Sequence, residues 1–277
     1  MTMLIELYQY LTTKCPPVAK RMGYLREAIA IHRRYARHRK TWEPHLEATK
    51  KVIREAIEAS SGGTGTAVVL GSGLLVDIPL DELSDAFDRV ELVDLIHMKP
   101  VRWIVEHYPN VGLVEADVTD VAGALVRFAA GEGALPVPQA PDLPGVDLDD
   151  VRLVVSANLV SQLPLVPGGW LKRRTKLDDD AVYAFGGRLV RAHLDWLLGL
   201  AERGITVCLI ADVEREFIDR DENPVQTYDG LYGERLPGRG HTWRWTVGPA
   251  GEVRSGITLR NKVVGIPDLA KAAAAAK

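Results

Sequence analysis

The chain has only two cysteines among its 277 residues, Cys15 and Cys208. Cys208 lies inside the apolar run ITVCLIA, a pattern typical of a cysteine that serves as a small buried hydrophobe. Such sparse use of cysteine fits a reducing cytoplasm. The first residues, MTMLIELYQYLTTKC, lack the basic stretch and cleavage site of a signal peptide, and no apolar run approaches the roughly 20 residues of a membrane helix. We therefore expect a globular cytoplasmic protein with no membrane span.

Several motifs of common catalytic sites are missing as well. The chain contains no G-x-S-x-G elbow and no Walker loop, and its seven histidines have no metal-ligand spacing. Three consecutive acids, Asp178 to Asp180, precede a helical pattern, where they suit the positive end of the helix dipole better than a metal. We expect no metal site.

Charge is spread unevenly along a chain whose formal net charge is only −3. Between Lys14 and Arg54 there are 12 Lys or Arg residues against three acids, and between Asp117 and Asp150 there are seven acids against one arginine. The basic segment is most simply the solvated face of a helix. A nucleic-acid partner is the less favoured alternative, and it would require binding that weakens steeply with salt.

The first 60 residues have a helical pattern. Residues 17–40 place apolar side chains near helical spacing, and a second helix is predicted from Pro44, since proline suits a first helical turn. The sequence SSGGTGT then breaks the pattern. The predicted organisation is a helical cap at 1–60, a main domain at 61–267 and a low-complexity tail at 268–277.

Strand and helix patterns alternate through the main domain, which indicates a parallel sheet. Five apolar segments have the length of buried strands, at 67–70, 89–95, 111–117, 151–158 and 204–212. The segments HTWRWTV (241–247) and GEVRSGITL (251–259) then flank a turn, a pattern that predicts an antiparallel hairpin. We therefore predict an α/β fold with a doubly wound, mainly parallel, seven-stranded Rossmann-like sheet and an antiparallel C-terminal hairpin.

The turn after the first strand carries the strongest functional signal. It reads Gly71-Ser72-Gly73, and Asp94 follows 23 residues after Gly71, where nucleotide-binding α/β units place a carboxylate that holds a ribose. Asp77 and Pro79 delay the start of the next helix, so no helix N-terminus lies directly behind the glycines to meet a pyrophosphate. An acid there would repel phosphate and favour an ammonium group. The turn therefore favours an adenosine ligand without phosphate.

These segments resemble the class I S-adenosylmethionine-dependent methyltransferases over roughly residues 66–265. VVLGSG matches the family's glycine turn, EADVTD matches the loop after strand three, and SANLVSQLP matches the segment that faces the methyl group. The resemblance implies S-adenosylmethionine as cofactor, with Asp94 binding the ribose and Asp117 the adenine amino group. The residues that we predict to bind the cofactor, of which Asp77 is our own addition to the family pattern, are Gly71, Ser72, Gly73, Asp77, Asp94, Leu95, Asp117, Val118 and Asn158.

Two residues depart from the family pattern. Val69 stands where the family has an acid that receives the methionine ammonium, and Leu75 replaces the third glycine. Asp77 can supply the missing charge from the other side of the turn. The segment after strand four has Asn158 but continues with Leu159 and Val160, so the signature of amino methylation is absent.

Candidate catalytic residues follow the later strands. Asn158 is the best candidate for orienting the substrate, and His193 and Tyr183, on or before the long helix, are candidate bases. Asp212 and Glu214 follow strand five at the same end of the sheet. The segment 166–176, VPGGWLKRRTK, predicts a loop able to close over an acidic substrate.

Three functions are compatible with these patterns. The leading hypothesis is a methyltransferase acting on a small molecule. The rival is a non-catalytic scaffold or sensor that binds S-adenosylmethionine or S-adenosylhomocysteine, favoured by Val69, Leu75 and the missing amino-methylation signature. An NAD-binding oxidoreductase is the third class.

Overall fold

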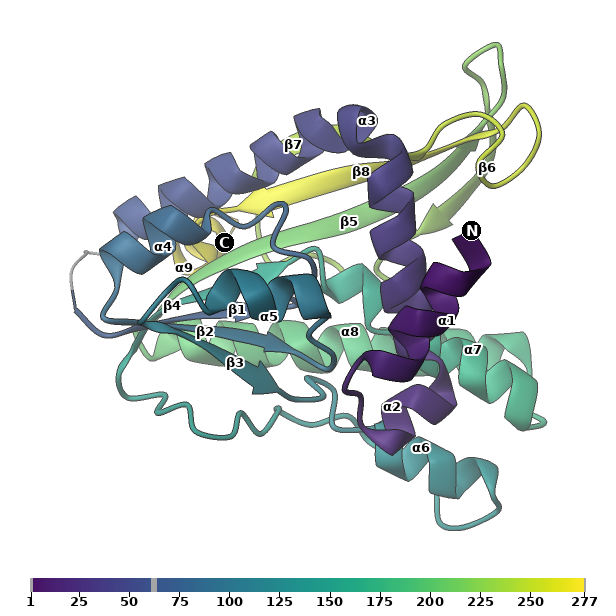
Figure 1. The fold of residues 1–277 in the computed structure, drawn as a ribbon, viewed down its shortest axis with the longest axis horizontal. Coiled ribbons are helices and arrows are strands. Elements are labelled where there is room, and N and C mark those ends of the chain that lie inside the picture. Colours follow the sequence, from purple (N-terminus) through teal and green to yellow (C-terminus); the bar gives the residue numbers. More distant parts are fainter. Residues whose placement is uncertain (1, 61–63, 277) are drawn as a thin grey trace.

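The computed structural model describes residues 2–60 and 64–276, with side chains from residue 6 onward. Its centre is a sheet of eight strands (Figure 1). The strands are β1 (Thr66–Leu70), β2 (Arg89–Asp94), β3 (Val111–Glu115), β4 (Val151–Ala157), β5 (Thr206–Ile218), β6 (Pro224–Asp229), β7 (His241–Gly248) and β8 (Thr258–Ile266).

The strand order is β3-β2-β1-β4-β5-β8-β7, and β6 pairs with β5 outside this path. Strands β1 to β5 are parallel, whereas β8 lies antiparallel to both β5 and β7. The predicted fold class is therefore confirmed, with β6 as an additional strand. Strand β5 is 13 residues long: its first part pairs with β4, and its later part continues beside β6 and β8.

Helices cover both faces of the sheet. In Figure 1, α3, α4 and α5 lie on one face and α8 on the other, while α1, α2, α6 and α7 gather around one end. The helices are α1 (Thr2–Thr12), α2 (Pro17–Met22), α3 (Tyr24–Ala59), α4 (Leu80–Ala86), α5 (Lys99–Val105), α6 (Ala122–Ala129), α7 (Leu165–Arg174), α8 (Asp179–Glu202) and α9 (Leu269–Ala274), with a short 3-10 helix η1 (Val160–Gln162).

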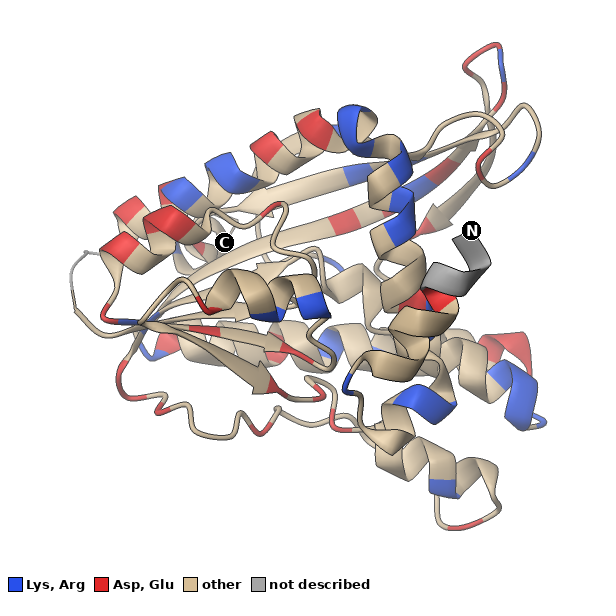
Figure 2. Ribbon diagram, viewed as in Figure 1, with Lys and Arg blue, Asp and Glu red and all other residues tan. Residues whose placement is uncertain are grey.

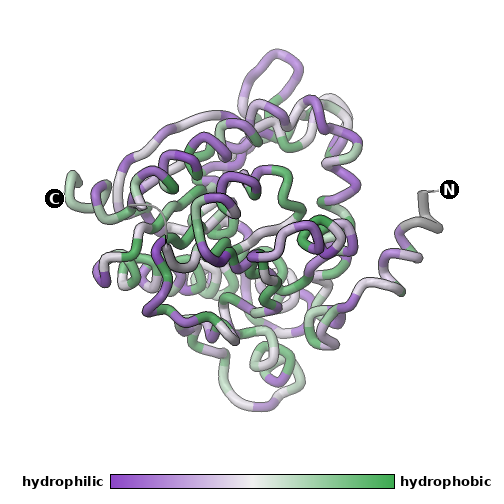
Figure 3. Tube along the Cα trace, turned by 60° about the vertical axis from the view of Figure 1, so that its left-hand side comes forward, coloured by the Kyte–Doolittle hydropathy of each residue, from purple (hydrophilic) through white to green (hydrophobic). Residues whose placement is uncertain are grey.

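Alternation along the buried strands divides the core between the two faces. Val69 packs on the side of α3, α4 and α5, whereas its neighbours Val68 and Leu70 pack on the side of α8. Figure 3 shows apolar segments concentrated in the middle of the molecule, with α1 at its margin. Because both faces are covered, the central strands are apolar throughout, which is why they could be recognised from the sequence.

Helix α3 joins the N-terminal region to the sheet. It is continuous from Tyr24 to Ala59, with a kink at His38, whose φ of −118° and ψ of 22° are not helical. The prediction of two helices separated near residue 40 is thus correct in part: the break is a kink, and Pro44 lies in the helix after it. The second half of α3 lies so close to β8 that a Cβ on Gly265 would come within 2.7 Å of Val52.

A cluster of aromatic residues holds α3 against β7. Trp42 is only 4% exposed, donates a hydrogen bond of 3.0 Å from Nε1 to the Val247 carbonyl, and meets the Trp245 ring edge-on at 4.9 Å between centroids. The His45 ring stacks on Trp245 at 4.0 Å, and its Nδ1 accepts a hydrogen bond of 3.0 Å from Trp243. Burial lowers the pKa of His45 to about 3, so the stacked imidazole is neutral.

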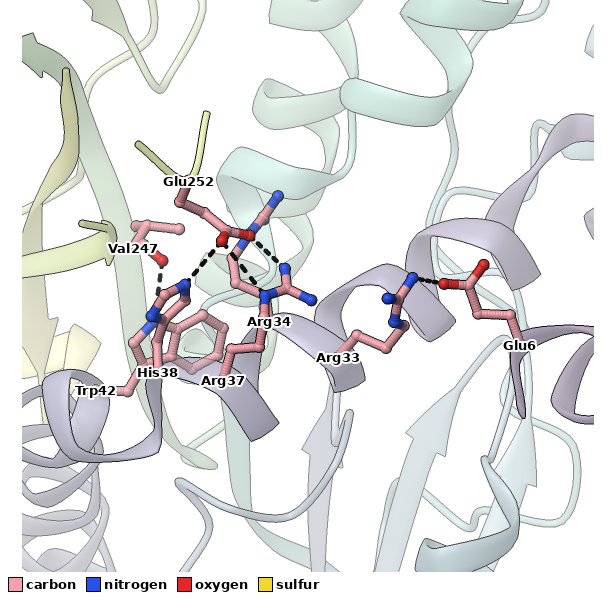
Figure 4. A network of polar contacts seen from close by, with 8 residues as sticks. All are labelled: Glu6, Arg33, Arg34, Arg37, His38, Trp42, Val247 and Glu252. Atoms are coloured by element: carbon pink, nitrogen blue, oxygen red, sulfur yellow. Dashed lines mark hydrogen bonds and ion pairs between the residues drawn. The ribbon is translucent and has the colours of Figure 1, made fainter. Parts of the chain in front are cut away.

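A polar network closes the same interface near the kink (Figure 4). The Glu252 carboxylate, in the loop between β7 and β8, accepts a hydrogen bond of 2.9 Å from Nε2 of His38 and further hydrogen bonds from Arg37. Arg34 lies 3.7 Å from the same carboxylate. The hydrogen bonds from Arg37 and His38 lower the Glu252 pKa to about 2.

This network predicts a pH-dependent contribution to stability. Because the folded-state pKa of Glu252 lies below its ordinary value of 4.5, its stabilisation is present above that value and is lost as the pH falls toward about 2. We expect Glu252→Gln to reduce the free energy of unfolding by about 1–2 kcal/mol at pH 7. Urea denaturation from pH 7 to pH 2.5 should show this difference shrinking through the acidic range. Glu43→Gln, an exposed acid on α3, is the control, and an equal loss in both variants would contradict the assignment.

Two C-terminal predictions need correction. The second hairpin strand is β8 at Thr258–Ile266, so its prediction at 251–259 was wrong: Gly251 and Gly256 adopt the positive φ of turns, and the alternation of buried residues begins only after them. In the segment predicted as a tail, α9 forms instead, and Leu269 is fully buried against the α8 side of the core.

Within the described part of the chain, no helix has the length and apolarity to cross a membrane.

Candidate functional site

The glycine turn after β1 lies directly against the end of β2. The backbone N–H groups of Gly71 and Ser72 both donate to the Val93 carbonyl, at 2.9 and 3.3 Å. The next N–H, of Gly73, donates to Oδ2 of Asp94 at 3.0 Å. The predicted glycine turn and Asp94, the acid predicted to bind the ribose, are therefore in direct contact.

Both oxygens of Asp94 accept backbone hydrogen bonds. Oδ1 accepts from the N–H of Ile96 at 3.3 Å, while Oδ2 accepts from Gly73. An ionised carboxylate has about four lone-pair sites, so these two bonds orient the group and leave capacity for ligand hydroxyls. Asp94 is half-buried, and Gly73 beside it is exposed.

Backbone conformation makes the turn compact. Gly71 and Gly73 have φ of 72° and 53°, and Leu75 has φ of 62°. Leu75 thus holds a left-handed conformation that glycine adopts without strain. Although leucine replaces the family's third glycine here, the backbone keeps the conformation of a glycine. A Cβ on Gly71 would lie 3.1 Å from Cβ of Leu159, which shows how closely the turn approaches the segment after β4.

Asp77 and Asn158 meet across this approach. Nδ2 of Asn158 donates to Oδ2 of Asp77 at 2.9 Å, although the two residues are 81 positions apart. The Asn158 backbone has φ of 52° and its N–H donates to the Ile210 carbonyl at 3.0 Å, so the residue is fixed at the end of β4. Burial raises the Asp77 pKa, and the hydrogen bond from Asn158 partly offsets this shift.

Two buried polar atoms at this place have no hydrogen-bond partner among the described residues. They are Oγ of Ser72 and Oδ1 of Asn158, on side chains that are 1% and 5% exposed. Buried polar groups are nearly always paired, and leaving one unpaired costs about 1–3 kcal/mol. Such atoms beside a turn and two acids mark a place for a polar ligand.

Asp117 lies in the loop before helix α6 and bonds its first residue. Its Oδ1 accepts from the N–H and hydroxyl of Thr119 at 3.0 and 2.6 Å, and its Oδ2 accepts from the N–H of Ala122 at 3.0 Å. Asp117 thus has a structural role in its own loop. Tyr24, at the start of α3, lies nearby: its pKa is raised by burial and further by the charge of Asp117. No sequence motif points to Tyr24, because its neighbourhood is created by the tertiary packing of α3.

The strand order, the reversed last strand and the turn bonded to the acid of β2 decide the architecture. The fold is a doubly wound, Rossmann-like α/β fold with a reversed last strand. No family model and no curated protein matches the chain. Solved structures match most of the chain at low identity and with low TM-scores.

Three of these solved structures are methyltransferase-related by name or contents. One is a complex of DhpI with S-adenosylhomocysteine, with 15% identity, 85% of this chain and 93% of that chain covered, and a TM-score of 0.33. Another is 1,6-didemethyltoxoflavin-N1-methyltransferase of Burkholderia thailandensis, bound to its named substrate and S-adenosylhomocysteine, with 11% identity, coverages of 87% and 89%, and a TM-score of 0.34. A SAM-dependent methyltransferase of Leishmania major has 12% identity, coverages of 96% and 83%, and a TM-score of 0.32.

The hydrogen bonds of the two predicted bases do not involve the glycine turn. His193 is 4% exposed on α8, and its Nε2 lies 3.0 Å from Oγ of Ser156 on the face of the sheet that α8 covers. Burial lowers the His193 pKa to about 4, so the ring is neutral at physiological pH. Tyr183 is 45% exposed and donates to Oδ2 of Asp229 at 3.4 Å, in a separate cavity beside β6.

The two apolar residues predicted for the cofactor are partly buried against the core. Leu95 packs against the core on the side of α3, and Val118 packs against the core on the side of α8. Within the ranges that the structure describes, no three His, Cys, Asp or Glu side chains are grouped to hold a metal. The loop predicted at 166–176 was wrong: most of it forms α7, whose Trp170 is 3% exposed.

His97 was missed by sequence reasoning. It follows β2 directly, is fully buried, and donates from Nε2 to the Val114 carbonyl at 3.1 Å. Burial lowers its pKa, and the nearby charge of Asp94 acts in the opposite direction. A histidine in this position carries no motif, so only the fold reveals that it lies beside Asp94.

Proposed function

We propose that the protein is an S-adenosylmethionine-dependent methyltransferase acting on a small molecule. The observation that carries this proposal is the arrangement of Asp94 against the glycine turn, with unpartnered buried atoms on Ser72 and Asn158 beside it. These groups fit the cofactor chemically: a carboxylate accepts hydrogen bonds from ribose hydroxyls, and the orphaned oxygens accept or donate to its polar end.

The chain's own residues divide the proposed binding task. Asp94 holds the ribose, and the backbone of Gly71 and Gly73 allows close approach because neither carries a Cβ. Asp77 receives the ammonium group in place of the acid that Val69 lacks, and Asn158 holds Asp77 in position through the bond of 2.9 Å. Leu95 and Val118 supply apolar contacts beside the adenine, and Asp117 contributes by ordering the loop before α6.

Methyl transfer demands positioning more than acid–base chemistry. The bound cofactor supplies a sulfonium-linked methyl group, and the protein's part is to orient the acceptor and exclude water. Asn158 is fixed by its left-handed backbone and its bonds to Asp77 and Ile210, which makes it a rigid group for orientation. Because His193 is buried away from the turn, its proposed role becomes support of Ser156 and β4.

A nucleic-acid acceptor remains the weaker proposal. The cations of α3 and the acids that follow α6 lie on different parts of the molecule (Figure 2). Near the kink, the arginines of α3 already form ion pairs, Arg33 with Glu6 and Arg37 with Glu252. Cations that are neutralised within the chain contribute less to phosphate binding.

A non-catalytic binding protein is the second candidate. The specific observation in its favour is that the carboxylates of Asp94 and Asp117 already accept hydrogen bonds from the chain itself. Acids that the chain itself holds in place suit a sensor or scaffold that binds S-adenosylmethionine or S-adenosylhomocysteine without reaction.

Calorimetry with S-adenosylmethionine, S-adenosylhomocysteine and NAD tests the binding class. We expect saturable binding of both adenosyl compounds and none of NAD, because the delayed helix after the turn offers no N-terminus for a pyrophosphate. Binding of NAD alone would overturn the proposal. Transfer of labelled methyl to a panel of small molecules then separates the enzyme from the non-catalytic binder.

A further inference from the structure

A cavity of about 320 Å³ lies beside the later half of β5. This volume is at the lower end of the range of about 300–1,000 Å³ that is typical of small-molecule pockets. Strands β5 and β6, helix α8 and the segment after β4 contribute its walls. Its lining includes Asp212, Glu214 and Arg215 of β5 and the aromatic residues Tyr183, Phe217 and Tyr228.

Asp212 presents an unused acceptor in this cavity. The residue is 3% exposed, and its Oδ2 accepts hydrogen bonds from Nδ2 of Asn261 at 2.8 Å and from Oγ of Ser161 at 3.4 Å. Its Oδ1 is buried and has no partner among the described residues. A buried carboxylate oxygen without a donor is costly, and a ligand that carries N–H groups removes that cost.

Arg215 presents an unused donor in the same cavity. Its Nε is buried and has no hydrogen-bond partner within the described part of the chain, where Arg215 also forms no ion pair. A guanidinium group matches a carboxylate in geometry and charge. Two residues of β5 that line the cavity therefore carry one unpaired acceptor and one unpaired cationic donor.

Aromatic rings form much of the remaining wall. Phe217 and Tyr228 meet at 5.8 Å between centroids with an angle of 73°, and Tyr183 and Tyr232 meet at 5.2 Å. Asp229 has less capacity for a ligand than Asp212, because its oxygens already accept from the N–H groups of Leu231 and Gly233 and from the Tyr183 hydroxyl. Rings of this kind pack well against a planar apolar group.

We propose that this cavity binds a small zwitterion with an aromatic side group, an amino acid or a derivative of one. The ligand's ammonium group donates to Oδ1 of Asp212, its carboxylate pairs with Arg215, and its ring packs against Phe217 and the tyrosines. Glu214 also lines the cavity, which disfavours a ligand that is purely an anion. This site is separate from the proposed adenosyl site, although Ser161 follows Asn158 by only three residues.

Three ligands that share one phenol ring test the proposal: L-tyrosine, tyramine and 4-hydroxyphenylpropionate. Calorimetry on the full chain without any adenosyl compound should show L-tyrosine binding about tenfold more tightly than either singly charged analogue, as loss of one charged hydrogen bond predicts. Asp212→Asn should weaken L-tyrosine and tyramine about tenfold and spare the acid. Arg215→Met should weaken L-tyrosine and the acid and spare tyramine.

Glu222→Gln is the matched control, since Glu222 lies on the same β5–β6 hairpin, pairs with Arg260 and does not line the cavity. If Asp212→Asn fails to fold, the ligand series on the unaltered protein and on Arg215→Met still decides. The proposal is overturned if none of the three compounds shows saturable binding. It is also overturned if 4-hydroxyphenylpropionate binds as tightly as L-tyrosine. Such a failure leaves the adenosyl binding measurement untouched, so the two proposals stand or fall separately.

Discussion

Asp94→Ala is expected to weaken S-adenosylhomocysteine binding by about 10- to 100-fold, because each hydrogen bond to a charged group contributes about 1.5–3 kcal/mol. Two effects act together. The substitution removes the carboxylate proposed to hold the ribose, and it releases the N–H of Gly73, which loses its bond of 3.0 Å. Calorimetry at constant salt measures the change directly.

Asp88→Ala is the control for this prediction. Asp88 also accepts a backbone hydrogen bond, from the N–H of Gly65 at 2.9 Å, but it lies just before β2, at the opposite end of that strand. We expect unchanged affinity for Asp88→Ala and a comparable small loss of thermal stability in both variants. Equal affinities in Asp94→Ala and the unaltered protein would remove the carboxylate from the site and, with it, the main support for adenosyl binding.

Trp42→Ala is expected to reduce the free energy of unfolding by about 3–5 kcal/mol, the usual cost of removing a large buried aromatic side chain. Trp42 is 4% exposed, bonds the Val247 carbonyl and packs edge-on against Trp245. Its loss leaves a cavity between α3 and β7 and an unsatisfied carbonyl. Urea denaturation followed by circular dichroism gives the difference.

Trp103→Ala is the control: it removes the same type of side chain from an exposed position. Trp103 is 64% exposed on α5, so its removal should change the free energy of unfolding by no more than about 0.5 kcal/mol. Similar losses in the two variants would contradict the packing described for α3 and β7.

The parallel strands could be predicted because burial on both faces leaves a local signature. Runs such as VVL at β1 and LVV at β4 are continuous in the chain and apolar on every residue. Strand β6 left no such signature: all its residues are exposed, and it exists because β5 extends beyond its parallel neighbour and offers a free edge.

The candidate site was predictable where its parts follow the strand ends. The order of the strands places Gly73 beside Asp94, and the residues that follow each strand identified both. The hydrogen bond between Asp77 and Asn158 forms because two segments distant in the sequence meet at the end of the sheet. The sequence predicted a role for the charge of Asp77 but not this bond. The neighbourhoods of Tyr24, His97 and Arg215 arise from packing alone, so no motif predicted them.

Helix α3 contributes residues to the hydrophobic core of the main domain. Val52, Ile53 and Ala56 are at most 2% exposed against the sheet, while Tyr24 at its other end lies near Asp117. A chain beginning at residue 61 would leave that apolar sheet face open to water and prone to self-association. The N-terminal segment is thus an integral part of the folded domain. Through α3, it contacts both the loop before α6 and the C-terminal strands.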